Sequence, residues 1–428
     1  MMKNLVIKNV RIVDAKNDFV GQVTVRDGLF YEVRSYSQDT MAFFDQGEHK
    51  AKPDSSCDGD YFVIDCGGLQ SVLMPAFIDL HAHFREPGFT YKEDIESGSR
   101  AAVKGGYTTV VLMANTNPPC STMDTVNYVI NRAKEIGLTD VFQVVSITDG
   151  MKGESVSHLE SLDETIKFIS DDGKGVMNDQ LMEKALIMSK NKGFIVISHA
   201  EDHNYSATDM RRAENNMTKR DIGACIKTGG RLHLAHVSTK EAIEMVRRAK
   251  MNGANITCEV TPHHIYATDD IVYRVNPPLR TSNDVISLVN AINDGIVDVI
   301  STDHAPHTAD DKAGGAPGIS GIETAFQLCL TKLIKDCCAI SLKKLSELMS
   351  YNPSRIAGVN KGLIKQGFEA DFIIADVKKS TAIDVSGFAS KGKNSPFDGN
   401  RVYGEILMTV KKGNIVYKNS ERNDLKTC

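Results

Sequence analysis

Eight short apolar runs alternate with polar, helix-forming segments from about residue 74 onward. Helical stretches between the runs include residues 179–191, 240–252 and 282–294. Strands that are apolar throughout are typical of a parallel sheet that helices cover on both faces. The runs are residues 75–80, 108–113, 141–146, 166–170, 194–198, 232–236, 257–261 and 297–301. Eight β/α units over about 230 residues predict an α/β protein built on a TIM-like (β/α)8 barrel.

Both ends of the chain have the composition of short strands instead. The first 35 residues hold four strand-like runs separated by Asp, Asn and Gly, and strand patterns return at residues 371–376, 405–410 and 414–417. We therefore predict a small β domain built from both termini, with residues 1–73 and 360–428 as its two parts and 74–359 as the barrel. The polar stretch 35–61 is typical of a long exposed loop.

Composition excludes several classes of protein. The formal charge of −5 and the pI near 6.2 provide no basic surface for nucleic acid. No apolar run approaches the roughly 18 residues of a membrane span, and the start of the chain lacks the pattern of a secretory signal. The nine cysteines follow no repeating spacing, which is typical of reduced thiols. We expect a cytoplasmic protein that binds a small molecule.

A pair of histidines, His81 and His83, ends the first barrel run. Residues two apart in a strand point to the same side, so both rings can hold one metal ion. His-x-His alone is a weak signal.

Three further residues strengthen it, because each follows an apolar run. His199 and His236 close two of the runs, and Asp303 comes two residues after a third. Barrel enzymes assemble their sites at these strand ends, whereas a doubly wound open sheet binds at one switch point, so the distribution favours the barrel. His233 lies an odd number of residues from His236, and we expect it to face away from the barrel interior and to pack.

Imidazoles and carboxylates suit a divalent transition ion such as zinc. Such an ion lowers the pKa of bound water toward roughly 7 and polarises a carbonyl. Asp303 is then suited to act as general base and acid. The predicted reaction is hydrolysis of an unactivated C–N bond, or its reverse.

Over nearly its whole length the chain resembles the amidohydrolase superfamily, and within it the class I dihydroorotases. The resemblance rests on the segments 77–88, 105–109, 170–173, 199–202, 236–240, 276–280, 302–307, 321–325 and 391–397. The most specific are His-Phe-Arg-Glu-Pro-Gly at 83–88 and Lys-Gly-Lys-Asn-Ser-Pro-Phe at 391–397.

The resemblance implies reversible cyclisation of N-carbamoyl-L-aspartate to L-dihydroorotate, a step of pyrimidine synthesis. The substrate carries a carboxylate, which the planar guanidinium of Arg85 can bind bidentately. By the same resemblance Asn115 and His307 also contact this carboxylate, and Asn276 lies near the substrate ring. A turn residue before two prolines is the alternative interpretation of Asn276.

The resemblance also implies one or two zinc ions. His81, His83 and Asp303 would hold the first ion, His199 and His236 the second, and Asp172 would bridge them. An Asx turn before Gly173 is the alternative for Asp172. Related enzymes bridge with a carboxylated lysine on the fourth strand, where this chain has Lys167, so Lys167 is a rival to Asp172.

Two other functions compete with the dihydroorotase hypothesis. The first is a hydantoinase, dihydropyrimidinase or allantoinase, against which Arg85 indicates a carboxylated substrate. The second is a non-catalytic dihydroorotase-like partner of aspartate transcarbamoylase, but such proteins lose metal ligands and this chain keeps them all. We also expect a homodimer, with aspartate transcarbamoylase as a candidate partner.

Overall fold

The structure is a computed structural model that describes residues 4–36, 61–67, 71–420 and 426–427. Most of the polar stretch predicted as an exposed loop at 35–61 lies outside the described residues. Within them, no helix is long and apolar enough to cross a membrane.

Each of the eight apolar runs contains a strand, and all pairings among these strands are parallel. The strands are β6 (Phe77–Ala82), β7 (Tyr107–Leu112), β8 (Asp140–Gln143), β9 (Phe168–Ile169), β10 (Ile195–Ser198), β11 (Leu232–Leu234), β12 (Ile256–Val260) and β13 (Val299–Ile300). They form a three-stranded sheet, β6-β7-β8, and a five-stranded sheet, β13-β12-β11-β10-β9. Parallel bridges between Val145 and Ile169 and between Ala82 and His304 link the two sheets at both ends.

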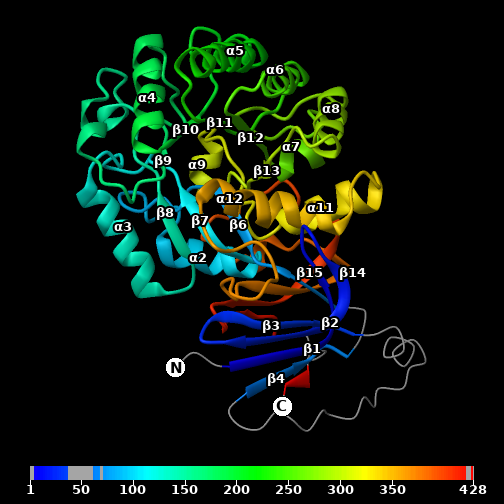
Figure 1. The fold of residues 1–428 in the computed structure, drawn as a ribbon. Helices are drawn as coiled ribbons and strands as arrows, with labels where there is room; N and C mark the ends of the chain where they lie inside the picture. Colours follow the sequence, from blue (N-terminus) through cyan, green and yellow to red (C-terminus); the bar gives the residue numbers. More distant parts are fainter. Residues whose placement is uncertain (1–3, 37–60, 68–70, 421–425, 428) are drawn as a thin grey trace.

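Helices lie outside these strands (Figure 1). They are α2 (Ile95–Lys104), α3 (Met123–Ile136), α4 (Asp179–Lys192), α5 (Met210–Thr228), α6 (Lys240–Met251), α7 (Pro262–Tyr266), α8 (Ser282–Asn293), α9 (Ala309–Ala313), α10 (Ala325–Cys329), α11 (Leu342–Ser346) and α12 (Asn352–Ala357). Helix α4 begins where Asn178 accepts hydrogen bonds from two backbone amides of the first turn, and it ends at Gly193 with φ of 82°. These caps explain why the predicted helix 179–191 is accurate to one residue.

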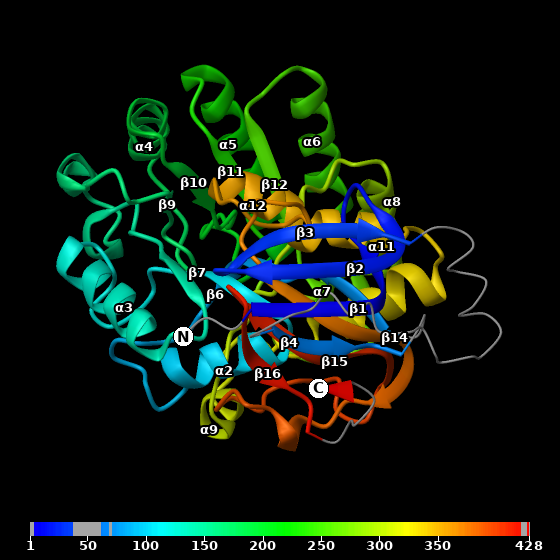
Figure 2. The same ribbon diagram turned by 60° about the horizontal axis from the view of Figure 1, so that its bottom comes forward.

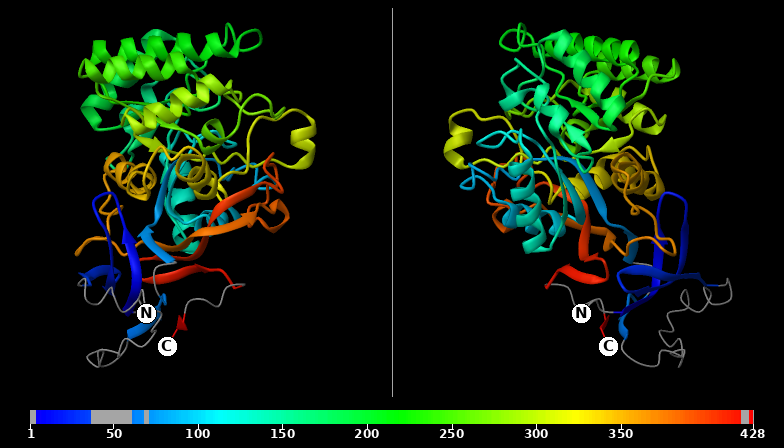
Figure 3. Two further views of the ribbon diagram at one scale, coloured as in Figure 1. Left: turned by 90° about the vertical axis from the view of Figure 1, so that its right-hand side faces the viewer. Right: turned by 60° about the vertical axis from the view of Figure 1, so that its left-hand side comes forward.

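A third sheet, with nine strands, combines strands from both ends of the chain. Its order is β16-β15-β14-β5-β1-β2-β3, and β4 pairs with β1 and β17. The strands are β1 (Asn4–Val13), β2 (Asp18–Arg26), β3 (Leu29–Ser35), β4 (Tyr61–Asp65), β5 (Ser71–Pro75), β14 (Phe372–Ala382), β15 (Arg401–Lys411), β16 (Asn414–Lys418) and β17 (Lys426–Thr427). Figure 2 shows β1 to β3, in blue, together with β14 to β16, in orange and red. Both termini lie at this end of the molecule, opposite the outer helices (Figure 3).

The run 75–80, predicted as one barrel strand, is divided between the two sheets. Strand β5 ends at Pro75 and pairs with β1 and β14, whereas β6 begins at Phe77 and pairs with β7. Ala76 is the only residue between them. This tight crossing fixes where β6 starts, and therefore where its far end presents His81 and His83.

Candidate metal centre

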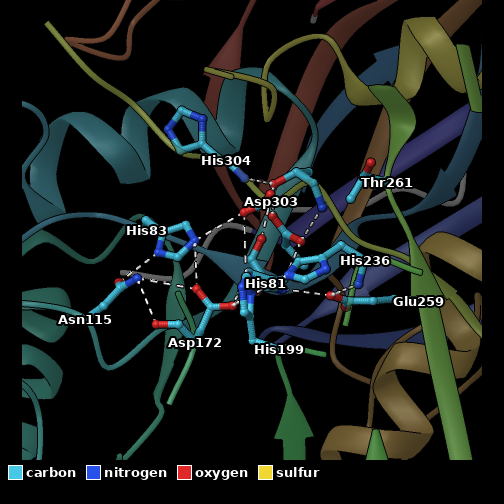
Figure 4. Close-up of polar contacts among 12 residues, drawn as sticks. His81, His83, Asn115, Asp172, His199, His236, Glu259, Thr261, Asp303 and His304 are labelled. Carbon is cyan, nitrogen blue, oxygen red and sulfur yellow. Dashed lines mark hydrogen bonds and ion pairs between the residues drawn. The ribbon is translucent and has the colours of Figure 1, made fainter. Parts of the chain in front are cut away.

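The six residues predicted as metal ligands meet at the carboxyl ends of the parallel strands. His81 lies in β6 and His83 directly follows it; Asp172, His199, His236 and Asp303 follow β9, β10, β11 and β13. All six side chains are buried. Figure 4 shows the four rings and two carboxylates turned toward one another. Because parallel strands end at one edge, residues up to 222 positions apart in sequence come into contact.

Asp172 lies at the middle of this cluster. Its Oδ1 is 3.3 Å from His81 Nε2, 3.2 Å from His199 Nδ1 and 3.7 Å from His236 Nε2. Its Oδ2 is 3.5 Å from the Nε2 of His83. One carboxylate therefore contacts all four histidines.

Asp303 lies beside the two histidines at the end of β6, His81 and His83. Its Oδ1 is 3.2 Å from His83 Nε2 and 3.6 Å from His81 Nε2. Donor atoms that each lie 2.0–2.2 Å from a tetrahedral ion are about 3.4 Å apart, so these separations suit a divalent ion.

Two groups of donors within this cluster could hold a metal ion: His81 with His83 and Asp303, and His81 with Asp172 and His236. The Nε2 of His81 is fully buried and makes no hydrogen bond to any residue that the structure describes. A buried nitrogen without a hydrogen bond is costly unless it has another partner, such as a cation. The donor set therefore fits a metal ion.

Three rings of the cluster are oriented from behind by an oxygen acceptor. His81 Nδ1 lies 2.7 Å from Glu259, His83 Nδ1 lies 2.9 Å from Asn115, and His199 Nε2 lies 2.9 Å from Glu201. When that nitrogen carries the hydrogen, the other nitrogen has its lone pair free and faces the cluster. The atoms that face the cluster are thus Nε2 of His81 and His83 but Nδ1 of His199.

Charge in the cluster keeps its carboxylates ionised. Burial alone would raise the pKa of Asp172, but His81, His199 and His236 hold it well below its usual range. Burial would likewise raise the pKa of Asp303. The hydrogen bond with His83 and the charges of the neighbouring rings lower that pKa instead. At His199, burial lowers the pKa, yet Asp172 and Glu201 together raise it to about 9, so this ring carries a second proton on Nδ1 at neutral pH, which a bound cation would displace. Ionised carboxylates and imidazoles are ligands that divalent transition ions accept.

A cavity of about 190 Å³ opens beside the cluster and gathers the predicted substrate residues. It is lined by His83, Arg85, Asn115, Asp172, Gly173, His199, His236, Asn276, Asp303, Ala305, His307, Pro317 and Gly318. Nine of the ten predicted site residues thus line one cavity, and the tenth, His81, lies buried directly behind them.

Arg85 and His307 form the cationic side of this cavity. An Nη2 of Arg85 is 3.3 Å from His307 Nε2, and the same His307 atom is 3.0 Å from the carbonyl oxygen of Pro317. Burial, with the charges of Arg85 and Lys92, lowers the pKa of His307 to about 3. A neutral His307 carries one N–H, which lies on Nε2 when that atom donates to Pro317, so the guanidinium of Arg85 is the group on this side of the cavity that suits a carboxylate.

The backbone is strained at the same place. Arg85, His236 and Asp303 have φ of 61°, 33° and 46°. Positive φ is uncommon outside glycine and persists where surrounding structure enforces it, and such residues concentrate at functional sites.

The rival bridging residue Lys167 lies away from the cluster. It is exposed and directly precedes β9, whereas Asp172 follows the carboxyl end of that strand. Lys167 lines a separate pocket with Asp163, Glu164 and Lys192. The structure therefore favours Asp172 over Lys167.

The expectation for His233 is wrong. Its ring does not face away from the interior: Nε2 lies 3.2 Å from Glu259 and Nδ1 lies 2.8 Å from Thr257, in the same network as His81. Glu259 itself was missed by the sequence reasoning. A charged residue within an otherwise apolar strand run was the available signal, because buried charges require partners.

Comparisons with known proteins agree with this geometry. Residues 72–416 match the amidohydrolase family. The chain is 47% identical to a dihydroorotase from Clostridium botulinum, over 97% of this chain and 99% of that one. The structure is similar to a dihydropyrimidinase from Brevibacillus agri, with a TM-score of 0.84 and 21% identity over 97% and 95% of the two chains. An L-hydantoinase from Arthrobacter aurescens has a TM-score of 0.82 and 24% identity over 98% and 96%. The two structural similarities concern the fold alone.

Proposed function

This chain belongs to the amidohydrolase family, and from that premise we propose that it is a dihydroorotase. The reaction is the reversible cyclisation of N-carbamoyl-L-aspartate to L-dihydroorotate, in pyrimidine synthesis. One observation carries the substrate assignment: the guanidinium of Arg85 lines the same cavity as the histidine–aspartate cluster. A carboxylated substrate can thus be held beside the residues that act on its amide bond.

We infer that the two parallel sheets form one closed (β/α)8 barrel over residues 74–359. The bridges Val145–Ile169 and Ala82–His304 support closure, because each joins the end of one sheet to the end of the other. Residues 1–73 and 360–428 would make up the small β domain, whose sheet also includes Met74 and Pro75 at the end of β5. Their strands share one sheet, which has a hydrophobic core of its own.

For the metal centre, we infer one or two zinc ions. His81, His83 and Asp303 would hold the first ion, His199 and His236 the second, and Asp172 would be shared between them. The contacts of Asp172 with all four rings support this division. A bound ion would polarise the scissile carbonyl and make water a stronger acid.

Asp303 is the group that moves the proton. Its lowered pKa keeps it ionised at neutral pH, as a general base requires. In the hydrolytic direction it takes a proton from the attacking water and returns that proton to the ring nitrogen as the C–N bond breaks. In the synthetic direction it removes a proton from the ureido nitrogen as the C–N bond forms and gives that proton to the hydroxyl group of the tetrahedral carbon, which leaves as water.

Substrate binding falls to the residues around the cationic side of the cavity. Arg85 would bind the substrate carboxylate through two parallel hydrogen bonds, and the ring of His307 would lie beside that carboxylate. Asn115 lines the same cavity while its amide group contacts His83 and Asp172. Asn276, in the loop between α7 and α8, would lie near the substrate ring.

Turnover of alternative substrates tests the proposal. Purified protein loaded with zinc should hydrolyse L-dihydroorotate and form it from N-carbamoyl-L-aspartate, with hydantoin, dihydrouracil and allantoin turned over far more slowly. Turnover of hydantoin without dihydroorotate would contradict the proposal.

A hydantoinase is the second candidate, because the structural relatives named above include one and a dihydropyrimidinase. Those relatives are less than 25% identical to this chain. A neutral hydantoin ring also offers no carboxylate to the guanidinium of Arg85. A non-catalytic partner of aspartate transcarbamoylase would bind no transition metal when purified. Homodimer formation, a transcarbamoylase partner and a cytoplasmic location stay predictions.

A further inference from the structure

Glu201 connects a ring of the candidate metal centre to the loop between α7 and α8, which carries Asn276. Its Oε2 lies 2.9 Å from His199 Nε2 and 2.8 Å from the side-chain amide nitrogen of Asn276, which donates to it. A single oxygen thus receives two hydrogen bonds, one from each side. The side chain of Glu201 is 13% exposed, so solvent screens these contacts only in part.

The contact orients His199 in a specific way. With its Nε2 hydrogen directed at Glu201, the ring presents Nδ1 to Asp172 and His236, at 3.2 and 2.9 Å. Without the carboxylate, the ring loses the partner that selects this tautomer and this rotation. Such acceptors behind a metal-binding imidazole affect metal affinity about 10–100-fold.

The loop that carries Asn276 is held rigidly by buried contacts. His264 Nε2 lies 3.0 Å from the carbonyl oxygen of Pro277, and Arg280 donates to Ser238 and Glu214 at 3.0 and 2.9 Å. Both anchoring side chains are buried. The amide of Asn276 is therefore presented to Glu201 by a supported backbone.

We propose that Glu201 is a positioning residue for His199, and that Asn276 acts on the metal centre through Glu201. The inference rests on the proposed function only in taking His199 as a metal ligand. It assigns Asn276 a task that contact with the substrate alone does not require. Affinity for the second ion should then depend on Asn276, a residue of the loop between α7 and α8.

The test measures zinc binding to the full-length protein from which metal has been removed, by competition with a chromophoric chelator. In Glu201→Gln, which keeps an acceptor oxygen but loses the charge, the weaker of two zinc sites should lose about tenfold in affinity, while the tighter site is unchanged. In Asn276→Ala the same site should lose about fivefold, the equivalent of one hydrogen bond. The double variant should lose no more than Glu201→Gln, because both changes interrupt one path.

Asp202→Asn is the matched control, because Asp202 is the adjacent carboxylate and contacts Asn204 and Asn216 instead of the cluster. It should bind both zinc ions like the original protein. Retention of the tighter site in each variant shows that the chain has folded. The absorption spectrum of bound Co²⁺ gives a second readout, which should change in Glu201→Gln and stay the same in Asp202→Asn.

The outcomes separate the two ideas. Unchanged affinity at both sites in Glu201→Gln overturns the inference, and so does an original protein that binds fewer than two ions. Unchanged zinc affinity with a raised KM in Asn276→Ala restricts Asn276 to the substrate and also overturns it. Loss of the weaker site in a protein that does not turn over dihydroorotate supports the inference and removes the proposed function alone.

Discussion

Glu259 Oε1 lies 2.7 Å from His81 Nδ1, and this contact joins β12 to β6 across 178 positions of sequence. The same oxygen accepts from the backbone amide of His236 at 3.3 Å, and Oε2 lies 3.2 Å from His233. Burial would raise the pKa of Glu259, but the charges and hydrogen bonds of His81 and His233 hold it well below its usual range. One fully buried carboxylate thus supports two candidate ligands from behind.

Glu259→Ala should therefore remove zinc from the site of His81. We expect an affinity loss of about 10–100-fold together with lower stability, because His81 loses its buried partner. Glu259→Gln, which keeps an acceptor oxygen, should lose less. Metal analysis after gel filtration at fixed free zinc measures both, and a fully loaded Glu259→Ala would contradict this role.

Arg85→Ala should weaken substrate binding and leave the metal in place. The guanidinium lines the cavity and contacts His307, while none of its contacts reaches a metal-facing nitrogen. Loss of one charge-assisted bidentate contact costs about 2–3 kcal/mol, so KM should rise at least about tenfold. Arg85→Lys should recover only part of the loss, because an ammonium lacks the planar fork. Steady-state kinetics with zinc analysis checks this, and zinc-free Arg85→Ala would show the assignment to be wrong.

Asp303→Asn should abolish proton transfer. General acid–base groups contribute about 10²–10⁴-fold, and Asp303 also contacts His81 and His83, so kcat should fall by at least about 10³-fold. The fall should be equal in the two directions, since the same group gives and takes the proton. Rates of dihydroorotate hydrolysis and formation measure it. Near-normal turnover would remove Asp303 from the mechanism.

His264 should make the protein less stable in acid. Burial lowers the pKa of this ring to about 4, below the 6.5 of an exposed histidine. The unfolded chain therefore binds a proton before the folded protein does. This contribution to stability is complete above pH 6.5 and decreases as the pH falls toward 4, by up to about 3 kcal/mol.

Urea denaturation between pH 4 and 7 measures this dependence. His264→Gln should have a flatter profile over that window than the original protein. The matched control is His203→Gln, since His203 is exposed and should leave the profile unchanged. Equal slopes in all three proteins would contradict the assignment.

Lys361→Met should destabilise the junction between the nine-stranded sheet and the sheet of β6, β7 and β8. Lys361 Nζ lies 2.6 Å from Asp140, 2.7 Å from Asp371 and 3.0 Å from Thr109 Oγ1, and its side chain is 4% exposed. Removing the cation leaves the buried carboxylate of Asp371 without it, at a cost of about 3–5 kcal/mol. Lys412→Met is the control, because Lys412 is 38% exposed and 3.6 Å from Asp140, and should cost less than about 1 kcal/mol. Equal unfolding midpoints for the two variants would contradict the prediction.

Strand and helix positions could be predicted because their signals are local. Each of the eight apolar runs contains a strand, and helix ends agree to within about a residue where a cap such as Asn178 or Gly193 is present. Because residues 72–78 are apolar throughout, the point where β5 ends and β6 begins could not be predicted. Their different partners, β1 and β14 for one and β7 for the other, come from distant parts of the chain.

The choice between Asp172 and Lys167 shows the same limit. Both residues lie on or beside one short strand, and a local pattern does not determine which end faces the metal centre. Strand direction in the assembled sheet places Asp172 among the histidines and leaves Lys167 exposed at the other end. The error for His233 arose similarly, because the chain changes direction between the end of β11 and His236, so counting alternate residues across that turn fails.

By itself, the sequence determined the candidate ligands His81, His83, His199, His236 and Asp303, because each coincides with the end of an apolar run, a property of neighbouring residues. Only the tertiary structure decided how their nitrogens are oriented. Glu259, Asn115 and Glu201 select the metal-facing atom of three rings. Two of these acceptors lie 178 and 32 positions from their histidines, so only packing of separate strands brings them within hydrogen-bonding distance.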